Sequence, residues 1–404
     1  MLKRNKYDFF IFILILSLSM GSIGGALQLS RLFAMLLSPY LLVRIGTAMP
    51  IIKKLFVWSV ALLLYGTLSL LWTPDTSEGI KQILYLFVHL LLFFEIIVFS
   101  RYAKSPLHSI STGWLYFVII CSAIGLWELT TGNHLEIAKD RADVDNFSGV
   151  IISRFYTNAT FGNFNTFVTV LCFALPWMFY MQEAQSFLKW LTSILLIIIA
   201  TILTLLNASR GGVLSFAIMF LVYVLLTRLN RFSKIAGLVV LAVGTILFFN
   251  YSETLFASIL ARSEDGGLID IGVRGEIWGN ALKCISDSMG FGVGVGGMSA
   301  SMSKYAHGGI DITHNLFLEI FVIYGFVFAF AFAVFILKMG VNSLSLKDSR
   351  KKVVLMAIIA MPIYTIINSG YLGLPQLYAH IATIYVFINY ERIKYSNRPL
   401  FAIA

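Results

Sequence analysis

Residues 315–337 read NLFLEIFVIYGFVFAFAFAVFIL, an apolar run whose one charged residue is Glu319. A helix needs roughly 20 consecutive apolar residues to cross the hydrocarbon core of a bilayer, and this run is long enough. Similar runs recur along the chain, separated by short polar segments. The sequence therefore predicts an all-α polytopic integral membrane protein with about twelve transmembrane helices. The predicted spans are 9–26, 29–46, 55–72, 80–100, 113–130, 165–181, 187–207, 212–228, 235–250, 315–337, 353–369 and 375–390.

The composition excludes an ordinary soluble domain. Hydrophobic residues make up 58% of the chain and charged residues 12%, against about 25% charged in a typical soluble domain. Because the bilayer replaces water as the solvent, one helical bundle can use the whole length. We expect residues 1–404 to form a single membrane domain.

The formal net charge of +10 could indicate nucleic-acid binding, so the position of the basic residues has to decide. They cluster in alternate predicted loops, and most acidic residues occupy the other loops. By the positive-inside rule this pattern reflects membrane topology, with both termini cytoplasmic in a bacterial inner membrane. We expect membrane lipid as a partner and no nucleic acid. The basic clusters are Lys3, Arg4 and Lys6; Arg44, Lys53 and Lys54; Arg101 and Lys104; Arg228, Arg231 and Lys234; Lys338, Lys347, Arg350, Lys351 and Lys352; and Arg392, Lys394 and Arg398.

Two predicted external segments are long, residues 131–164 and residues 251–313, the second lying before the tenth span. Long loops are often functional. Within the second, apolar residues recur at helical spacing, which predicts a helix lying on the membrane surface. They are Ile277, Trp278, Ala281, Leu282 and Ile285.

Arg210 lies in the stretch Asn207-Ala208-Ser209-Arg210-Gly211-Gly212, between two predicted spans. A charge at membrane depth costs about 2.5–3.5 kcal/mol, so Arg210 should face protein or a ligand. The two glycines after it permit close approach of a backbone or ligand. The alternative is an arginine that extends to the outer headgroups.

Arg274 and Glu276 open the amphipathic stretch of the large loop. A guanidinium there could bind phosphate oxygens in a bidentate manner. Glu276 could instead pair with Arg274, and an exposed loop arginine can simply be solvated.

His314 and Asn315 lie where the large loop meets the tenth span. Histidine suits proton transfer near neutral pH. An isolated histidine at a helix start can also be an ordinary interfacial residue. That second interpretation suffices for the remaining histidines, which are His89, His108, His134, His307 and His380.

Gly292, Gly294 and Gly297 have the spacing G-x-G-x-x-G of dinucleotide-binding turns. No strand–helix–strand pattern surrounds them, which excludes that fold. We predict a tight loop whose backbone amides could still meet an anion.

Asp143 and Asp145 offer a carboxylate pair of the kind that holds a divalent cation against a diphosphate. Glu136 and Asp140 lie nearby, which favours a solvated acidic run. We therefore predict no metal site.

The order of these motifs resembles the superfamily of O-antigen ligases and Wzy-type O-antigen polymerases. The motifs are Ser209-Arg210-Gly211-Gly212, then Arg274 with Trp278, then Gly292-Val293-Gly294-Val295-Gly296, then His314-Asn315-Leu316-Phe317-Leu318. The likeness spans roughly Thr201 to Leu337. A weaker likeness lies upstream at Arg154 and at Phe161-Gly162-Asn163-Phe164-Asn165, where many members read G-N-P-N and Phe164 replaces the proline.

The resemblance implies an enzyme that acts on undecaprenyl-diphosphate-linked glycans at the outer face of the inner membrane, without cofactors and, in the ligases, without metal. It implies catalytic roles for Arg210, Arg274 and His314. We hypothesise that the arginines hold the lipid diphosphate and that His314 takes the proton of the attacking hydroxyl. Asn315 and Glu276 would orient these groups. Arg141 and Arg154, in the loop 131–164, would bind a second lipid-linked chain.

Several functions stay open. A polymerase and a ligase share this donor but differ in acceptor, which is another lipid-linked repeat unit or the lipid A core; the loop 131–164 favours the polymerase. For a polymerase, the resemblance suggests a chain-length regulator and a flippase as partners. A transporter would use charges buried in spans, such as Glu95 and Glu319. A purely structural subunit would leave Arg210 and His314 unexplained.

Overall fold

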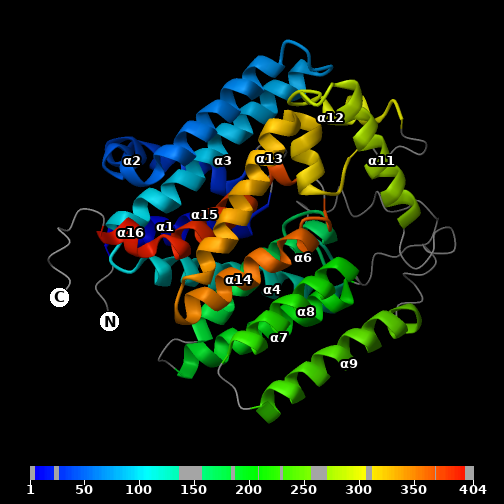
Figure 1. Ribbon diagram of the computed structural model, residues 1–404. Coiled ribbons are helices and arrows are strands. Elements are labelled where there is room, and N and C mark those ends of the chain that lie inside the picture. The colour runs from blue at the N-terminus through cyan, green and yellow to red at the C-terminus, as the bar shows by residue number, and fades with distance from the viewer. Residues whose placement is uncertain are drawn as a thin grey trace.

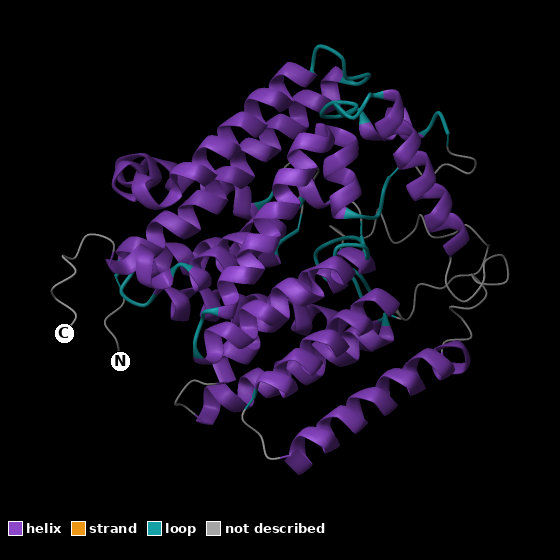
Figure 2. Cartoon of the chain, in the orientation of Figure 1, coloured by secondary structure: helices purple, strands orange, loops and turns teal. Residues whose placement is uncertain are grey.

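The computed structural model describes residues 5–21, 27–135, 157–182, 187–207, 209–227, 231–255, 271–305, 312–368 and 370–395. The regular structure of these residues is helical, with no strand element (Figure 2). The predicted all-α class is confirmed for this part of the chain.

Figure 1 labels most of the helices of the described residues. Their bounds are α1 Lys6–Leu16, η1 Ser17–Ser19, α2 Leu29–Ser69, α3 Thr76–Tyr102, α4 Pro106–Thr131, α6 Phe164–Gln182, α7 Phe187–Leu206, α8 Arg210–Leu226, α9 Arg231–Leu255, α11 Ile271–Asp287, α12 Met298–Met302, α13 Leu316–Leu344, α14 Asp348–Tyr364, η3 Tyr371–Gly373, α15 Pro375–Ile388 and α16 Tyr390–Tyr395.

Among the described residues, five helices are long and apolar enough to cross a membrane, which makes this a multi-pass membrane protein. They are α2, α3, α4, the part of α6 from Phe164 to Met181, and α13. Three shorter apolar stretches accompany them, at Trp190–Leu206, Arg210–Leu226 and Gly237–Ile246. The predicted number of about twelve spans is not confirmed.

One difference from the predicted spans lies in α2. It contains the predicted span 29–46 and the span 55–72 up to Ser69 within one helix, and includes Pro39 and Pro50. We expected a loop there because Arg44, Lys53 and Lys54 are charged. Prolines inside such a helix are tolerated where neighbouring groups satisfy the freed carbonyls, so the chain remains helical through this basic segment.

Helix α15 lies at the centre of the bundle, and nearly all of its side chains are buried. Thr383 accepts a hydrogen bond of 3.2 Å from Nε1 of Trp114 on α4. His380 lies 3.0 Å from the Tyr364 hydroxyl on α14 and stacks on Phe173 of α6. His380 thus packs as a core residue, whereas we expected an interfacial one.

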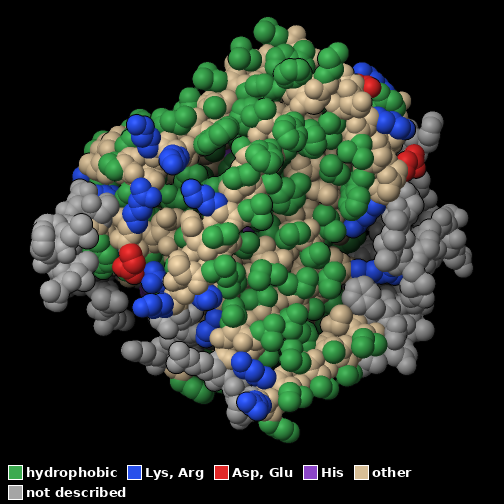
Figure 3. Space-filling model, in the orientation of Figure 1, with side chains coloured by type: hydrophobic (Ala, Val, Ile, Leu, Met, Phe, Trp, Pro, Cys, Tyr) green, Lys and Arg blue, Asp and Glu red, His purple; other side chains and the backbone are tan. Residues whose placement is uncertain are grey.

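Large apolar side chains cover much of the outer surface. Leu42 and Val43 of α2 and Phe330 and Leu337 of α13 are all at least 60% exposed. Figure 3 shows a broad hydrophobic area, with Lys and Arg gathered at its left edge, where Figure 1 places α1 and α16. A continuous exposed apolar surface of this extent is typical of contact with lipid.

Basic residues of different predicted loops meet at that edge. Arg44 donates from Nε to the Tyr7 hydroxyl at 3.0 Å, and Arg392 donates from Nη2 to the Pro50 carbonyl at 3.2 Å. These contacts bring the basic segment of α2 beside α1 and α16, as expected if these segments lie on one side of the membrane.

The glycine-rich loop 290–297 runs alongside a break in α13. Gly325 interrupts that helix with φ 78° and ψ −176°. Val293 donates its backbone N–H to the Val322 carbonyl at 2.7 Å, and Phe326 donates to the Gly290 carbonyl at 2.8 Å. The loop therefore forms hydrogen bonds with backbone groups of α13 that the break leaves without helical partners.

The amides of this loop are occupied by the protein. Val295 N–H donates to Ser69 Oγ at 3.0 Å, and Gly296 N–H donates to Gln82 Oε1 at 3.1 Å. A Cβ at Gly296, whose φ is +83°, would lie 2.3 Å from the nitrogen of Gly79. The expectation that these amides meet an anion is wrong, because they anchor the loop to the α2–α3 hairpin.

The predicted amphipathic helix of the large loop is confirmed as α11. Its apolar face packs on protein: Ile277, Ala281 and Ile285 form a buried cluster with Met302 of α12 and Val322 of α13. Leu282, which we expected on the same face, is 56% exposed. The face that we expected on the membrane surface is thus largely covered by the chain itself.

Candidate functional site

Arg210 is the first residue of α8. Ser209 caps the helix by accepting the Gly212 N–H on its hydroxyl at 3.4 Å. Arg210 is half-buried, and its charge adds to the positive end of the helix dipole, so this end suits an anion.

The two glycines after Arg210 let α8 pack closely, as predicted. A Cβ at Gly211 would lie 2.8 Å from Cγ1 of Ile367, in the segment that follows α14. A Cβ at Gly212 would lie 2.3 Å from Cγ1 of Val168 on α6. Arg210 is therefore held beside the end of α14.

His314 has a backbone φ of 45°, in the left-handed region that few side chains adopt. Leu316, two residues further along the chain, donates its N–H to the Thr365 carbonyl at 3.0 Å. This bond places His314 beside the same end of α14 that Gly211 touches. Strained backbone of this kind often occurs at functional sites.

Arg274 lies in the first turns of α11 and is half-buried. One turn later, Trp278 donates from Nε1 to the Thr313 carbonyl at 3.1 Å. Burial lowers the pKa of His314, and the charge of Arg274 lowers it further. The imidazole is therefore neutral at neutral pH, the form that can accept a proton.

The structure thus brings the three predicted catalytic residues to one region. Arg210 and His314 lie beside the end of α14, and Arg274 lies close enough to affect the charge state of His314. Two guanidiniums beside a neutral imidazole can neutralise a phosphate-bearing leaving group and accept a proton.

Asn315 and Glu276 have different surroundings. Asn315 caps α13, with its side-chain oxygen accepting the N–H of Phe317 at 2.9 Å and of Leu318 at 3.3 Å. Glu276 is exposed, and the described residues contain no ion pair between it and Arg274. The side-chain oxygen of Asn315 is therefore used to cap α13, and its role in orienting the reacting groups stays a prediction.

Four further predicted residues lie outside the described residues. They are the predicted binding residues Arg141 and Arg154 and the carboxylate pair Asp143 and Asp145. In the part of the chain that is described, no group of three His, Cys, Asp or Glu residues could hold a metal ion.

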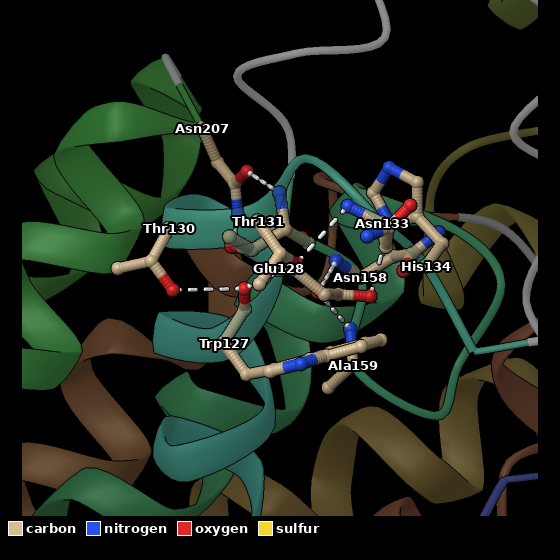
Figure 4. Close-up of polar contacts among 10 residues, drawn as sticks. Trp127, Glu128, Thr130, Thr131, Asn133, His134, Asn158, Ala159 and Asn207 are labelled. Carbon is tan, nitrogen blue, oxygen red and sulfur yellow. Dashed lines mark hydrogen bonds and ion pairs between the residues drawn. The ribbon is translucent and has the colours of Figure 1, made fainter.

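Glu128 and His134 form a buried polar cluster that the sequence did not reveal (Figure 4). The Glu128 side chain is fully buried, and its Oε1 lies 3.0 Å from Nδ1 of His134. Its Oε2 accepts the N–H groups of Asn158 and Ala159, both at 2.9 Å. Glu128 therefore fixes the start of the loop 157–163, which contains Phe161, Gly162 and Asn163 of the upstream motif.

Asn207 holds the same loop from the other side. Its Oδ1 accepts the Thr157 N–H at 2.8 Å, and its Nδ2 donates to the Thr157 carbonyl at 3.0 Å (Figure 4). Because Asn207 lies three positions before Arg210, these bonds connect the upstream loop to the start of α8. We predicted the motif around Asn207 but not this bond.

Glu319 and Arg31 hold the segment between α14 and α15. Glu319 accepts the N–H groups of Tyr371 at 3.0 Å and Leu372 at 2.9 Å. Arg31 donates to the Gly373 carbonyl at 3.2 Å, and its guanidinium lies 3.7 Å from the centre of the Tyr85 ring. The contacts of Glu319 are structural, so its burial does not require a transport pathway.

The comparisons with known proteins agree with the motifs. A family model described as O-antigen ligase matches residues 194–336, a range that contains Arg210, Arg274 and His314. The chain is 24% identical, over 307 residues, to the teichuronic acid biosynthesis protein TuaE of Bacillus subtilis. That alignment covers 71% of this chain and 61% of the relative, so the chain matches about three fifths of the relative's length.

Proposed function

Because the chain belongs to the O-antigen ligase/polymerase superfamily, we propose that it polymerises oligosaccharide repeat units linked to undecaprenyl diphosphate. The product is an O-antigen or a related surface polysaccharide. The reaction takes place at the outer face of the inner membrane, and both termini are cytoplasmic. A chain-length regulator and a flippase act as its partners.

The placement of Arg274 beside His314 is the observation that carries this proposal. Glycosyl transfer from a lipid diphosphate needs positive charge at the leaving group and a neutral base at the acceptor. Trp278 ties α11 to Thr313, and the pKa of His314 is lowered by burial and by Arg274. Arg210 adds a second guanidinium at a helix start.

The proposed step is a direct displacement. The acceptor hydroxyl oxygen bonds to the anomeric carbon of the donor while His314 takes the hydroxyl proton. The bond from that carbon to the diphosphate oxygen breaks, and the lipid diphosphate leaves with the electron pair. Arg210 and Arg274 stabilise the charge on that oxygen. The step calls on no cofactor or metal.

The alternative is a ligase that transfers the same glycan to the lipid A core. The matching family model is described as O-antigen ligase, which favours this reading, whereas the relative is named for teichuronic acid biosynthesis. The two differ in acceptor and share the site. We favour the polymerase because the external loop 131–164 carries Arg141 and Arg154, which would bind a second lipid-linked chain.

Complementation of a strain deleted for this gene tests the proposal. Surface glycan is compared by gel for the wild type, His314→Ala and the matched control His108→Ala, on α4. We expect the deletion and His314→Ala to lose the long ladder and leave one repeat on its anchor. Unattached polymer accumulating on undecaprenyl diphosphate would instead mean a ligase. Unchanged glycan in the deletion strain would contradict both.

A further inference from the structure

A cavity of about 240 Å³ lies between the end of α11, the residues after α12 and the connection from α2 to α3. These elements meet at the upper right of Figure 1. The lining includes Trp72, Asp287, Lys304 and Tyr305, together with the glycine-rich loop at Gly292 and Val293. The motifs discussed above do not account for the charged and aromatic side chains here.

The side chains of the cavity combine aromatic faces with groups that donate and accept hydrogen bonds. Trp72 is 45% exposed and is oriented by a bond of 3.1 Å from Nε1 to the Gly292 carbonyl. The Tyr305 hydroxyl donates to Asp287. Lys304 is exposed beside them. A sugar ring needs this combination, because its C–H face packs on an aromatic ring while its hydroxyls bind charged groups.

The cavity is rigidly built. The loop that lines it is bonded to Val322 of α13 through Val293 and to Ser69 of α2 through Val295. Cys284, in the cavity wall, packs in the cluster that joins α11 to α12 and α13. A preformed site of this kind binds without the cost of ordering mobile side chains and loops.

The cavity stands at a defined distance from the candidate catalytic residues. Arg274 and Asp287 lie near opposite ends of α11, about 20 Å apart at a rise of about 1.5 Å per residue. A glycan whose diphosphate lies at Arg274 could therefore reach the cavity only with a sugar several units along its chain.

We propose that this cavity is a subsite for one sugar ring of the glycan, remote from the diphosphate. Its volume is below the roughly 300–1,000 Å³ of sites for drug-sized ligands, so it suits one ring rather than a whole repeat unit. The identity of the glycan rests on the proposed function. The subsite makes the protein prefer glycans long enough to span from Arg274 to Asp287.

Calorimetric titration of the full-length protein in lipid nanodiscs tests the proposal. The probes are fragments of the strain's own surface glycan, one repeat unit long or many. We expect the wild type to bind the long fragment at least tenfold more tightly. Lys304→Gln and Asp287→Asn should each reduce this preference by about tenfold, as expected for losing a hydrogen bond to a charged group. Lys53→Gln, the same change at an exposed residue of α2, should keep it.

Equal affinity of the wild type for both fragments would overturn the subsite, as would variants that keep the wild-type preference. The deletion strain tests the proposed enzyme activity independently of this titration. If its surface glycan is unchanged while the wild-type protein still binds long fragments through Lys304 and Asp287, the proposed enzyme activity falls and the subsite stands.

Discussion

The indole of Trp278 donates a hydrogen bond of 3.1 Å to the carbonyl oxygen of Thr313. This bond connects α11, which carries Arg274, to the residue immediately before His314. It therefore fixes the distance between a guanidinium and an imidazole that lie 40 positions apart in the chain.

Trp278→Phe removes the donor and keeps an aromatic ring. The Thr313 carbonyl, whose residue is fully buried, then lacks a partner at a cost of about 1–3 kcal/mol. We expect turnover of a lipid-linked donor to fall about tenfold or more, with membrane expression unchanged. Trp190→Phe, at a 41% exposed tryptophan of α7, is the control. Equal turnover in both variants would mean that this bond does not position the site.

The pH dependence should report the neighbours of His314. Burial, and then the charge of Arg274, lowers the pKa of its imidazole below the ordinary value of 6.5. The neutral form therefore persists below pH 6.5. The acid limb of the pH–rate profile, where the rate falls as His314 is protonated, should lie below that pH. Arg274→Gln removes one cause, so the limb should move to higher pH.

Single-turnover rates measured across pH 4.5–8 detect this shift, because that range covers roughly the pH values at which histidines titrate. Arg210→Gln should lower the rate without moving the limb, because Arg210 is not among the causes of the shift. A limb that stays in place in Arg274→Gln would show that Arg274 does not act on His314.

The left-handed backbone at His314 predicts a difference between two inactive variants. His314→Ala keeps the cost of a side chain at φ 45°, whereas His314→Gly removes it. We expect the glycine variant to be more stable by about 1 kcal/mol. Thermal unfolding in detergent, followed by fluorescence, checks this. A glycine variant that unfolds at or below the temperature of the alanine variant would show that the residue is not strained.

Glu128 predicts an effect on the upstream loop. Glu128→Ala leaves the buried N–H groups of Asn158 and Ala159 without partners, at about 1–3 kcal/mol each. We expect a lower unfolding temperature and lower turnover. Glu128→Gln keeps an acceptor oxygen and should retain most of both. Glu391→Ala, at an exposed acid of α16 paired with Arg350, serves as control; a Glu128→Ala variant as stable as this control would rule out the role.

Hydropathy alone predicted the helical class, because apolar runs of roughly 20 residues are long enough to cross a bilayer as helices. It misplaced the boundary within α2, since charge at Arg44, Lys53 and Lys54 reads as a loop. A helix can carry such residues where the membrane ends, and Pro39 and Pro50 do not end it. The glycine spacing predicted a tight loop, but Ser69 and Gln82, which occupy its amides, lie over 200 positions away.

The candidate site was predictable where a charge at membrane depth costs free energy, as for Arg210, or where residues follow one another in a motif order, as for Arg274 and His314. Glu128 and His134 were missed because the partners of Glu128 include backbone N–H groups, which every sequence contains. Arg31 was missed because its partners, His89 and Gly373, are brought to it only by the fold.

The most direct test of the central claim uses purified full-length protein in nanodiscs with a lipid-linked repeat unit as donor and acceptor. Turnover and donor affinity are measured for the wild type and His314→Ala. The proposal predicts that the variant binds the donor as the wild type does while turnover falls by about 10²–10⁴, the range for a general base. Full turnover in His314→Ala would contradict it.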